Sequence, residues 1–125
     1  MTVLGAFGGP RLDHALANLW LLAHPALAET EVVLLDAHAR ASLVVAPGPG
    51  GRPVERALPG PAGTTVSLFP LGGDVEGITT TGFRYPLRDE SLRTGPARGL
   101  SNLREVPGAG VRVRRGRLLV VETVP

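Results

Sequence analysis

Short apolar or alternating stretches follow one another along most of the chain from Glu31 onward. Each is about five to nine residues long, and Gly, Pro or Asp lies at or near most of their ends, which is typical of strands. The predicted strands are Glu31–Asp36, Arg40–Ala46, Val54–Leu58, Thr64–Pro70, Val75–Phe83, Val111–Arg115 and Leu118–Thr123. Strands repeated at this spacing indicate a β-sandwich or barrel. The segment Arg115-Gly116-Arg117 is the predicted hairpin turn between the last two strands, with Gly116 at positive φ.

The first 28 residues have a different pattern. An apolar stretch, Thr2–Phe7, predicts a strand that runs into Gly8-Gly9-Pro10. Apolar residues then recur at helical spacing and predict a helix over Asp13–Ala23, which His24-Pro25 ends or continues as a short turn. The residues of the predicted apolar face are Leu12, Leu16, Leu19 and Ala23.

A strand, a glycine turn and a helix in this order are typical of α/β domains. We therefore expect a mainly β protein, in which an antiparallel β-sandwich is preceded by the strand–helix remnant of an α/β domain. The predicted boundary divides residues 1–28, the remnant, from residues 29–125, the sandwich.

Composition narrows the functional classes. The chain has no cysteine, which excludes disulfide and thiolate chemistry. It has no apolar run long enough to span a bilayer and no secretory signal at its start, so we expect a cytoplasmic protein with no membrane partner. The first arginines of the stretch Arg112–Arg117 alternate with Val111 and Val113, as on a strand with one solvated face, so we expect no nucleic-acid partner.

Candidate chemistry near the start lies where the predicted helix opens. Backbone N–H groups at a helix N-terminus attract phosphate, and Arg11 would add a bidentate clamp. The alternative is that the glycines form only a turn and Asp13 only a cap. His14 and Asn18 lie one helical turn apart and could bind a ligand or tie the helix to a neighbouring strand. The three histidines lack metal-ligand spacing, so we expect no metal site.

A second candidate region combines Gly77-Ile-Thr-Thr-Thr-Gly-Phe-Arg-Tyr-Pro-Leu87 with Gly99-Leu-Ser-Asn102. One interpretation is two strands joined by an irregular loop. The other is a small-ligand pocket lined by Thr, Tyr, Ser and Asn. The Ser101 hydroxyl and the Asn102 amide offer both donors and acceptors, but these two residue types also favour turns that cap their own backbone.

These two stretches resemble the bacterial thiamine pyrophosphokinases. That family carries a late Gly-Val-Thr-Thr-x-Gly-Leu-Lys-Tyr-Pro-Leu stretch followed by Gly-Ile-Ser-Asn. It also carries an earlier Gly-Gly-Arg-x-Asp-His-x-x-x-Asn block, which is similar to residues 8–18 here with Pro10 inserted. The blocks occur in the family's order, and together they cover nearly the whole chain but only the second half or so of a family member.

The resemblance implies an enzyme that transfers diphosphate from ATP to thiamine, with Mg²⁺, to give thiamine diphosphate and AMP. It implies catalytic roles for Arg11 and Asp13 beside the diphosphate, and nucleotide contacts for His14 and Asn18. It also implies a homodimer whose sites are shared between subunits. The residues that it implies for thiamine binding are Thr81, Tyr85, Ser101 and Asn102.

The family's metal-binding carboxylates are missing from the sequence. They belong to a Gly-Asp-x-Asp-Ser motif and a Lys-Asp-x-Thr-Asp motif, and neither occurs in this chain, which has no lysine. We therefore expect the chain to supply mainly the thiamine-binding half of the enzyme and to be inactive alone. The alternative is a non-catalytic thiamine-binding or dimerisation module.

Overall fold

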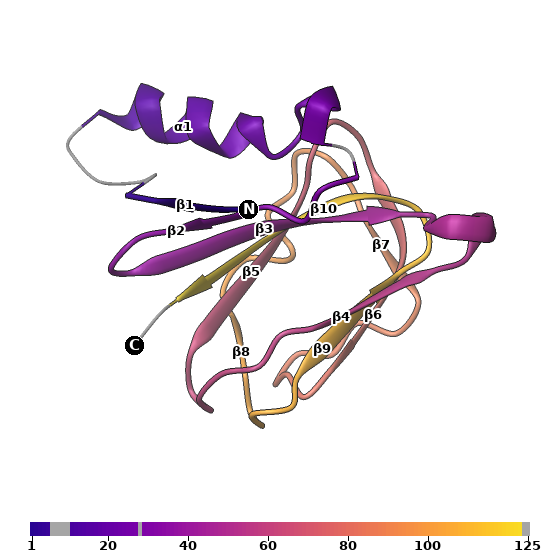
Figure 1. Ribbon diagram of the computed structural model, residues 1–125. Coiled ribbons are helices and arrows are strands. Elements are labelled where there is room, and N and C mark those ends of the chain that lie inside the picture. Colours follow the sequence, from indigo (N-terminus) through magenta and orange to yellow (C-terminus); the bar gives the residue numbers. More distant parts are fainter. Residues whose placement is uncertain (6–10, 28, 124–125) are drawn as a thin grey trace.

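Two sheets face one another and a single described helix lies on the outside of one of them (Figure 1). The computed structural model describes residues 1–5, 11–27 and 29–123. The helix is α1 (Leu12–Leu21), and two short 3₁₀ turns occupy Pro25–Leu27 and Pro49–Gly51. The strands are β1 (Thr2–Leu4), β2 (Val33–Leu35), β3 (Ala39–Ala46), β4 (Val54–Ala57), β5 (Thr65–Pro70), β6 (Val75–Thr81), β7 (Glu90–Leu92), β8 (Asn102–Leu103), β9 (Gly110–Val113) and β10 (Gly116–Thr123).

The larger sheet has six strands in the order β1-β2-β3-β10-β5-β8, and the smaller has four in the order β4-β9-β6-β7. Among the described strands, β1 and β2 form a parallel pair and the other pairs are antiparallel. The predicted mainly β sandwich with a leading strand and helix is therefore confirmed. Because β1 continues the larger sheet, the boundary between residues 1–28 and 29–125 stays a prediction.

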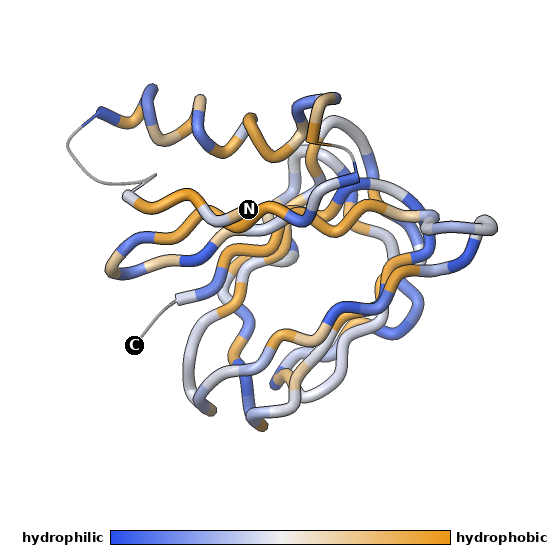
Figure 2. Tube along the Cα trace, viewed as in Figure 1, coloured by the Kyte–Doolittle hydropathy of each residue, from blue (hydrophilic) through white to orange (hydrophobic). Residues whose placement is uncertain are grey.

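Alternation along β10 shows why the larger sheet is covered on both faces. Leu118 and Val120 point into the core between the sheets, with Val44, Val66, Ile78 and Val111. Leu119 and Val121 point to the opposite face, where Leu22, Leu34 and Ala41 form a second apolar cluster beneath α1. Figure 2 shows the apolar positions concentrated in the central strands of the larger sheet and along the helix.

The helix begins and ends close to the predicted residues, but its predicted apolar face is wrong in the first half. Leu12 is 72% exposed and Leu16 40% exposed. The contacts with the sheet come from Leu19, which the prediction included, and from Leu22, which it did not. The helix touches the sheet near its C-terminal end, which is followed at once by the predicted short turn at Pro25. No described helix is long and apolar enough to cross a membrane.

The predicted hairpin between the last two strands is also wrong. The strand β9 pairs with β4 and β6, whereas β10 pairs with β3 and β5, so the chain crosses from one sheet to the other. Gly116 does have positive φ (113°), and a Cβ there would lie 2.9 Å from the Asp74 carbonyl oxygen. Each of the two strands has one face of core residues. When β9 and β10 lie in facing sheets, these two faces pack against each other in the core, which explains why the chain crosses between the sheets.

Two short strands, β7 and β8, were not predicted. The strand β6 ends at Thr81, two residues earlier than predicted, because Gly82 takes a positive φ of 79°. The predicted Gly8-Gly9-Pro10 turn and the end of the predicted Thr2–Phe7 strand lie outside the described residues.

Candidate functional site

The segment of residues 99–105, here called the β8 segment, connects the two sheets along one side of the sandwich. On one side, Asn102 and Leu103 pair with Val66 and Thr65 of β5 in the larger sheet. On the other side, the Arg84 N–H donates to the Leu103 carbonyl (2.9 Å). The β8 segment therefore lies between β5 and the chain that follows β6 of the smaller sheet.

Gly99 and Ser101 set the entry to this segment. The Leu68 N–H donates to the Gly99 carbonyl (2.9 Å), and a Cβ on Gly99 would lie 2.3 Å from the Leu68 carbonyl oxygen. This close approach to β5 requires glycine. Ser101 has a φ of 59°, and its N–H donates to the Ser67 Oγ (3.0 Å) while its own side chain is exposed.

The Asn102 side chain is bonded to the backbone of Tyr85. The Tyr85 N–H donates to Asn102 Oδ1 (3.1 Å), and Asn102 Nδ2 donates to the Tyr85 carbonyl (2.8 Å). The Leu103 N–H also donates to Asn102 Oδ1 (2.9 Å). These bonds place Tyr85, which is 63% exposed, beside the turn that carries Ser101.

The threonines of β6 have different roles. Thr80 Oγ1 accepts from the Leu87 N–H (2.8 Å) and Thr79 Oγ1 from the Asp89 N–H (3.1 Å), so both hold the loop after Tyr85 against the strand. Thr81 is exposed and lines a hollow of about 450 Å³ on the outer face of the smaller sheet. Tyr85, Ser101 and Asn102 are not among the residues that line this hollow. Thr81 is therefore close to Tyr85 in sequence but contributes to a separate concavity.

Arg104 is a residue of this region to which the sequence assigned no role. Its guanidinium is buried and donates to the Leu58 carbonyl (3.0 Å), to Thr64 Oγ1 (2.5 Å) and to Glu122 Oε1 (2.6 Å). Glu122 is itself buried, and Arg40 lies at 3.6 Å from its other oxygen. A buried arginine with three acceptors fixes the chain that leaves β8 to β10. The alternation of β10, which turns Glu122 toward the core, is the sequence signal that could have indicated this pair.

The N-terminal candidates cluster at the start of α1. Arg11 Nε donates to Asp13 Oδ1 (2.9 Å), and Arg11 Nη2 lies 2.5 Å from Asp13 Oδ2. Hydrogen bonding to Arg11 lowers the pKa of Asp13, and the His14 N–H adds to this effect. His14 is exposed and Asn18 is half-buried. The ion pair of Arg11 and Asp13 is solvent-exposed. An anion could therefore bind Arg11 in competition with Asp13.

The structure does not bring the two groups of candidates together. In the larger sheet β1 and β8 are at opposite edges, and α1 lies over the outer face on the β1 side while β8 is far from it (Figure 1). Within one chain, Arg11 and Asp13 therefore cannot act on a ligand held by Ser101. Among the described residues, no group of three His, Asp or Glu side chains could hold a metal ion.

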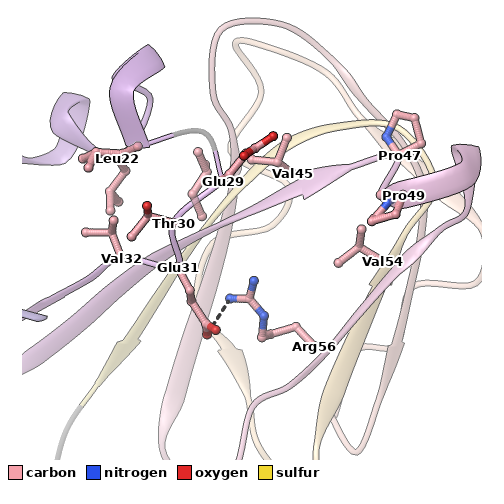
Figure 3. Close-up of a pocket in the computed structure, with 13 residues that line it drawn as sticks. Leu22, Glu29, Thr30, Glu31, Val32, Val45, Pro47, Pro49, Val54 and Arg56 are labelled. Atoms are coloured by element: carbon pink, nitrogen blue, oxygen red, sulfur yellow. Dashed lines mark ion pairs between the residues drawn. The ribbon is translucent and has the colours of Figure 1, made fainter. Parts of the chain in front are cut away.

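A larger cleft of about 740 Å³ lies elsewhere, between the end of α1 and the β3–β4 connection (Figure 3). Leu22 and Val32 lie on one side of it, Pro47 and Val54 on the other, and Glu31 and Arg56 form an ion pair at 3.6 Å. None of the predicted site residues lines this cleft.

Comparison with known families identifies the domain to which the β8 segment belongs. Residues 55–118 match the family described as thiamin pyrophosphokinase, vitamin B1 binding domain. The chain belongs to this family. The matched range includes Thr81, Tyr85, Ser101 and Asn102, and it excludes the N-terminal candidates. No curated protein sequence is significantly similar to the chain.

Solved structures of thiamine pyrophosphokinases have the same fold. The Bacillus subtilis enzyme superposes with a TM-score of 0.82 at 24% identity, over 99% of this chain and 55% of that one. The Geobacillus thermodenitrificans enzyme gives a TM-score of 0.79 at 25% identity, over 99% of this chain and 54% of that one. A thiamin pyrophosphokinase from Candida albicans gives 0.74 at 14% identity, over 99% and 44%. The chain thus spans little more than half of the two bacterial proteins.

Proposed function

We propose that this chain is the thiamine-binding part of an enzyme that transfers diphosphate from ATP to thiamine, giving thiamine diphosphate and AMP. The observation that carries the proposal is the match of residues 55–118 to the vitamin B1 binding domain, because this range contains the whole β8 segment and Tyr85. ATP as the donor also favours the cytoplasm as the place of the reaction.

In this proposal the β8 segment recognises the aminopyrimidine ring of thiamine. The Ser101 hydroxyl is exposed and can both donate and accept a hydrogen bond, as a ring with an amino group and ring nitrogens requires. The exposed Tyr85 beside it offers an aromatic face to a flat heteroaromatic ring. Asn102 joins them as the third member of the site, whereas Thr81 lines the separate hollow on the outer face of the smaller sheet.

The hydroxyl of thiamine would attack the β-phosphorus of ATP, and AMP would leave. Arg11 would neutralise charge on the diphosphate, with Asp13 orienting the guanidinium, and His14 and Asn18 would contact the nucleotide. Mg²⁺ is the expected cofactor of this reaction, but the described residues offer no carboxylate cluster for it, so no step on this chain is assigned to the metal.

A homodimer would reconcile this assignment with the fold. The helix α1 and the strand β8 lie toward opposite edges of the larger sheet (Figure 1). Arg11 of one subunit could therefore reach only a thiamine that is bound at β8 of a second subunit. Light scattering at tens of micromolar should then give twice the monomer mass. A monomer mass would remove the N-terminal residues from the proposed site.

Thiamine binding is the direct test. Titration calorimetry of the chain should show saturable, weak binding. The β8 segment alone encloses the ligand only in part, because the N-terminal candidates lie at the other edge of the larger sheet. An analogue with a carbonyl oxygen in place of the amino group should bind about five- to tenfold more weakly, as should thiamine to Ser101→Ala. No saturable binding of thiamine at several millimolar would contradict the proposed function.

The alternative is a non-catalytic thiamine-binding module, which the match to the vitamin B1 binding domain would equally support. Both functions predict thiamine binding. The purified chain with thiamine, ATP and Mg²⁺ is expected to release no AMP, because the described residues include no group of side chains that could bind the metal ion. Thiamine-dependent AMP release would rule out the non-catalytic module.

A further inference from the structure

The hydrogen-bonding groups of the Asn102 amide are largely occupied before any ligand arrives. A side-chain amide oxygen has two lone pairs, and on Asn102 Oδ1 they accept from the Tyr85 and Leu103 N–H groups. One Nδ2 hydrogen is given to the Tyr85 carbonyl. The amino group of an aminopyrimidine is a donor, so it finds no free acceptor on this side chain.

The exchange of two bonds between the Asn102 amide and Tyr85 imitates a pair of residues in an antiparallel ladder. It continues the contact between the β8 segment and the chain after β6 by one residue beyond the bond from Arg84 to Leu103. The next anchor along the chain is Leu87, whose carbonyl accepts from the Thr80 N–H (2.9 Å). Tyr85 thus lies between two backbone anchors, and Asn102 fixes its peptide groups.

We infer that Asn102 is a positioning residue, which acts on the ligand through Tyr85 by holding the phenol ring beside the Ser101 hydroxyl. This inference rests on the proposed thiamine site and assigns its direct contacts. Ser101 Oγ accepts from the ligand's amino group, the Tyr85 ring covers the ligand's face, and Asn102 sets the distance between them. Ser101 itself is fixed independently, through its N–H bond to Ser67 Oγ.

The first measurement needs no ligand. Tyr85 is the single tyrosine of the chain, so its ring and amide signals are assignable without ambiguity. Asn102→Ala should speed hydrogen exchange of the Tyr85 amide by about tenfold or more, since the N–H loses its acceptor. Asn102→Asp keeps an acceptor for that N–H and should restore most of the protection. Unchanged exchange in Asn102→Ala would overturn the inference.

The second measurement is a double-mutant cycle on thiamine affinity. Asn102→Ala alone should weaken binding about five- to tenfold. In a Tyr85→Ala background it should have almost no further effect, because the ring that it positions is gone. Ser101→Ala is the matched control: it should weaken binding in both backgrounds and leave Tyr85 exchange unchanged.

The outcomes separate this inference from the function on which it rests. If the wild-type chain binds no thiamine, the proposed function and the inference both fall. If it binds and the losses from Asn102→Ala and Tyr85→Ala simply add, the ligand contacts Asn102 directly and only the inference falls.

Discussion

The β8 segment and helix α1 carry the two groups of candidate residues, and they are attached to the sandwich in different ways. The β8 segment is bonded on both sides by backbone and side-chain hydrogen bonds, and it includes the buried Arg104. The helix has no buried residue within Leu12–Leu21, and it contacts the sheet mainly through its last turns. The same interaction, an arginine with a carboxylate, occurs in both regions.

The two ion pairs show what this difference means. The side chains of Arg104 and Glu122 are 2% and 8% exposed, and those of Arg11 and Asp13 are 62% and 63% exposed. Breaking a buried pair leaves a charge in the core, whereas breaking an exposed pair leaves it in water. Substitutions in the β8 segment should therefore affect the stability of the fold, whereas substitutions at the start of α1 should leave it almost unchanged.

The largest effect should follow from removal of Arg104. Arg104→Ala leaves Glu122 buried without its close partner and removes the donors to Leu58 and Thr64, so the free energy of unfolding should fall by about 3–5 kcal/mol. Chemical denaturation measures this. The matched control is Arg40→Ala, which removes the exposed, more distant arginine of the same carboxylate and should cost less than about 1 kcal/mol. Equal losses for the two variants would contradict the comparison.

The helix should show the second effect, and only near its C-terminal end. Leu22→Ala removes a buried side chain from the cluster on the larger sheet and should cost about 2–3 kcal/mol. Leu12→Ala, at an exposed position of the same helix, should change stability by less than about 0.5 kcal/mol. A large loss from Leu12→Ala would mean that the first turns of α1 are covered in solution.

Glycine at position 99 should give the third effect. Gly99→Ala places a methyl group against the Leu68 carbonyl and must push the β8 segment away from β5, at a cost of about 1–3 kcal/mol. Gly108→Ala is the control, since a Cβ there meets no atom within 4 Å. The Gly99 variant should also lose affinity for thiamine, because Ser101 lies only two residues further along the same segment. A stable Gly99→Ala chain with full affinity would show that the segment adapts.

Sequence reasoning predicted the sheet-forming stretches well because they alternate with buried positions. It failed where pairing depends on distant partners. The β9–β10 hairpin was inferred from a local turn signal, but core residues on both strands place them in opposite sheets. The helix face was inferred from periodicity alone, which does not say how far along its length the sheet reaches.

The candidate site shows the same limit. Motifs identified Ser101, Asn102 and Tyr85, and the structure brings these three together. They did not show that Asn102 is bonded to Tyr85 or that Arg104 is buried. Both facts depend on hydrogen bonds to backbone groups that are 17 and 46 residues away in the sequence. The distance between α1 and β8 was likewise hidden, since it depends on strand order in the larger sheet.

The smallest effect should come from the exposed pair on α1, through pH. Arg11 lowers the pKa of Asp13 in the folded chain, so the carboxylate stabilises the fold above its ordinary pKa of about 3.9. This contribution should disappear as the pH falls through the lowered value. The difference in melting temperature between wild type and Asp13→Asn should therefore be small and positive at pH 6, and it should vanish as the pH falls through the lowered pKa of Asp13. High salt should reduce it at pH 6, because both side chains are in water. A difference that persists at low pH, or that matches the effect of Arg104→Ala, would show that the start of α1 is held as firmly as the β8 segment.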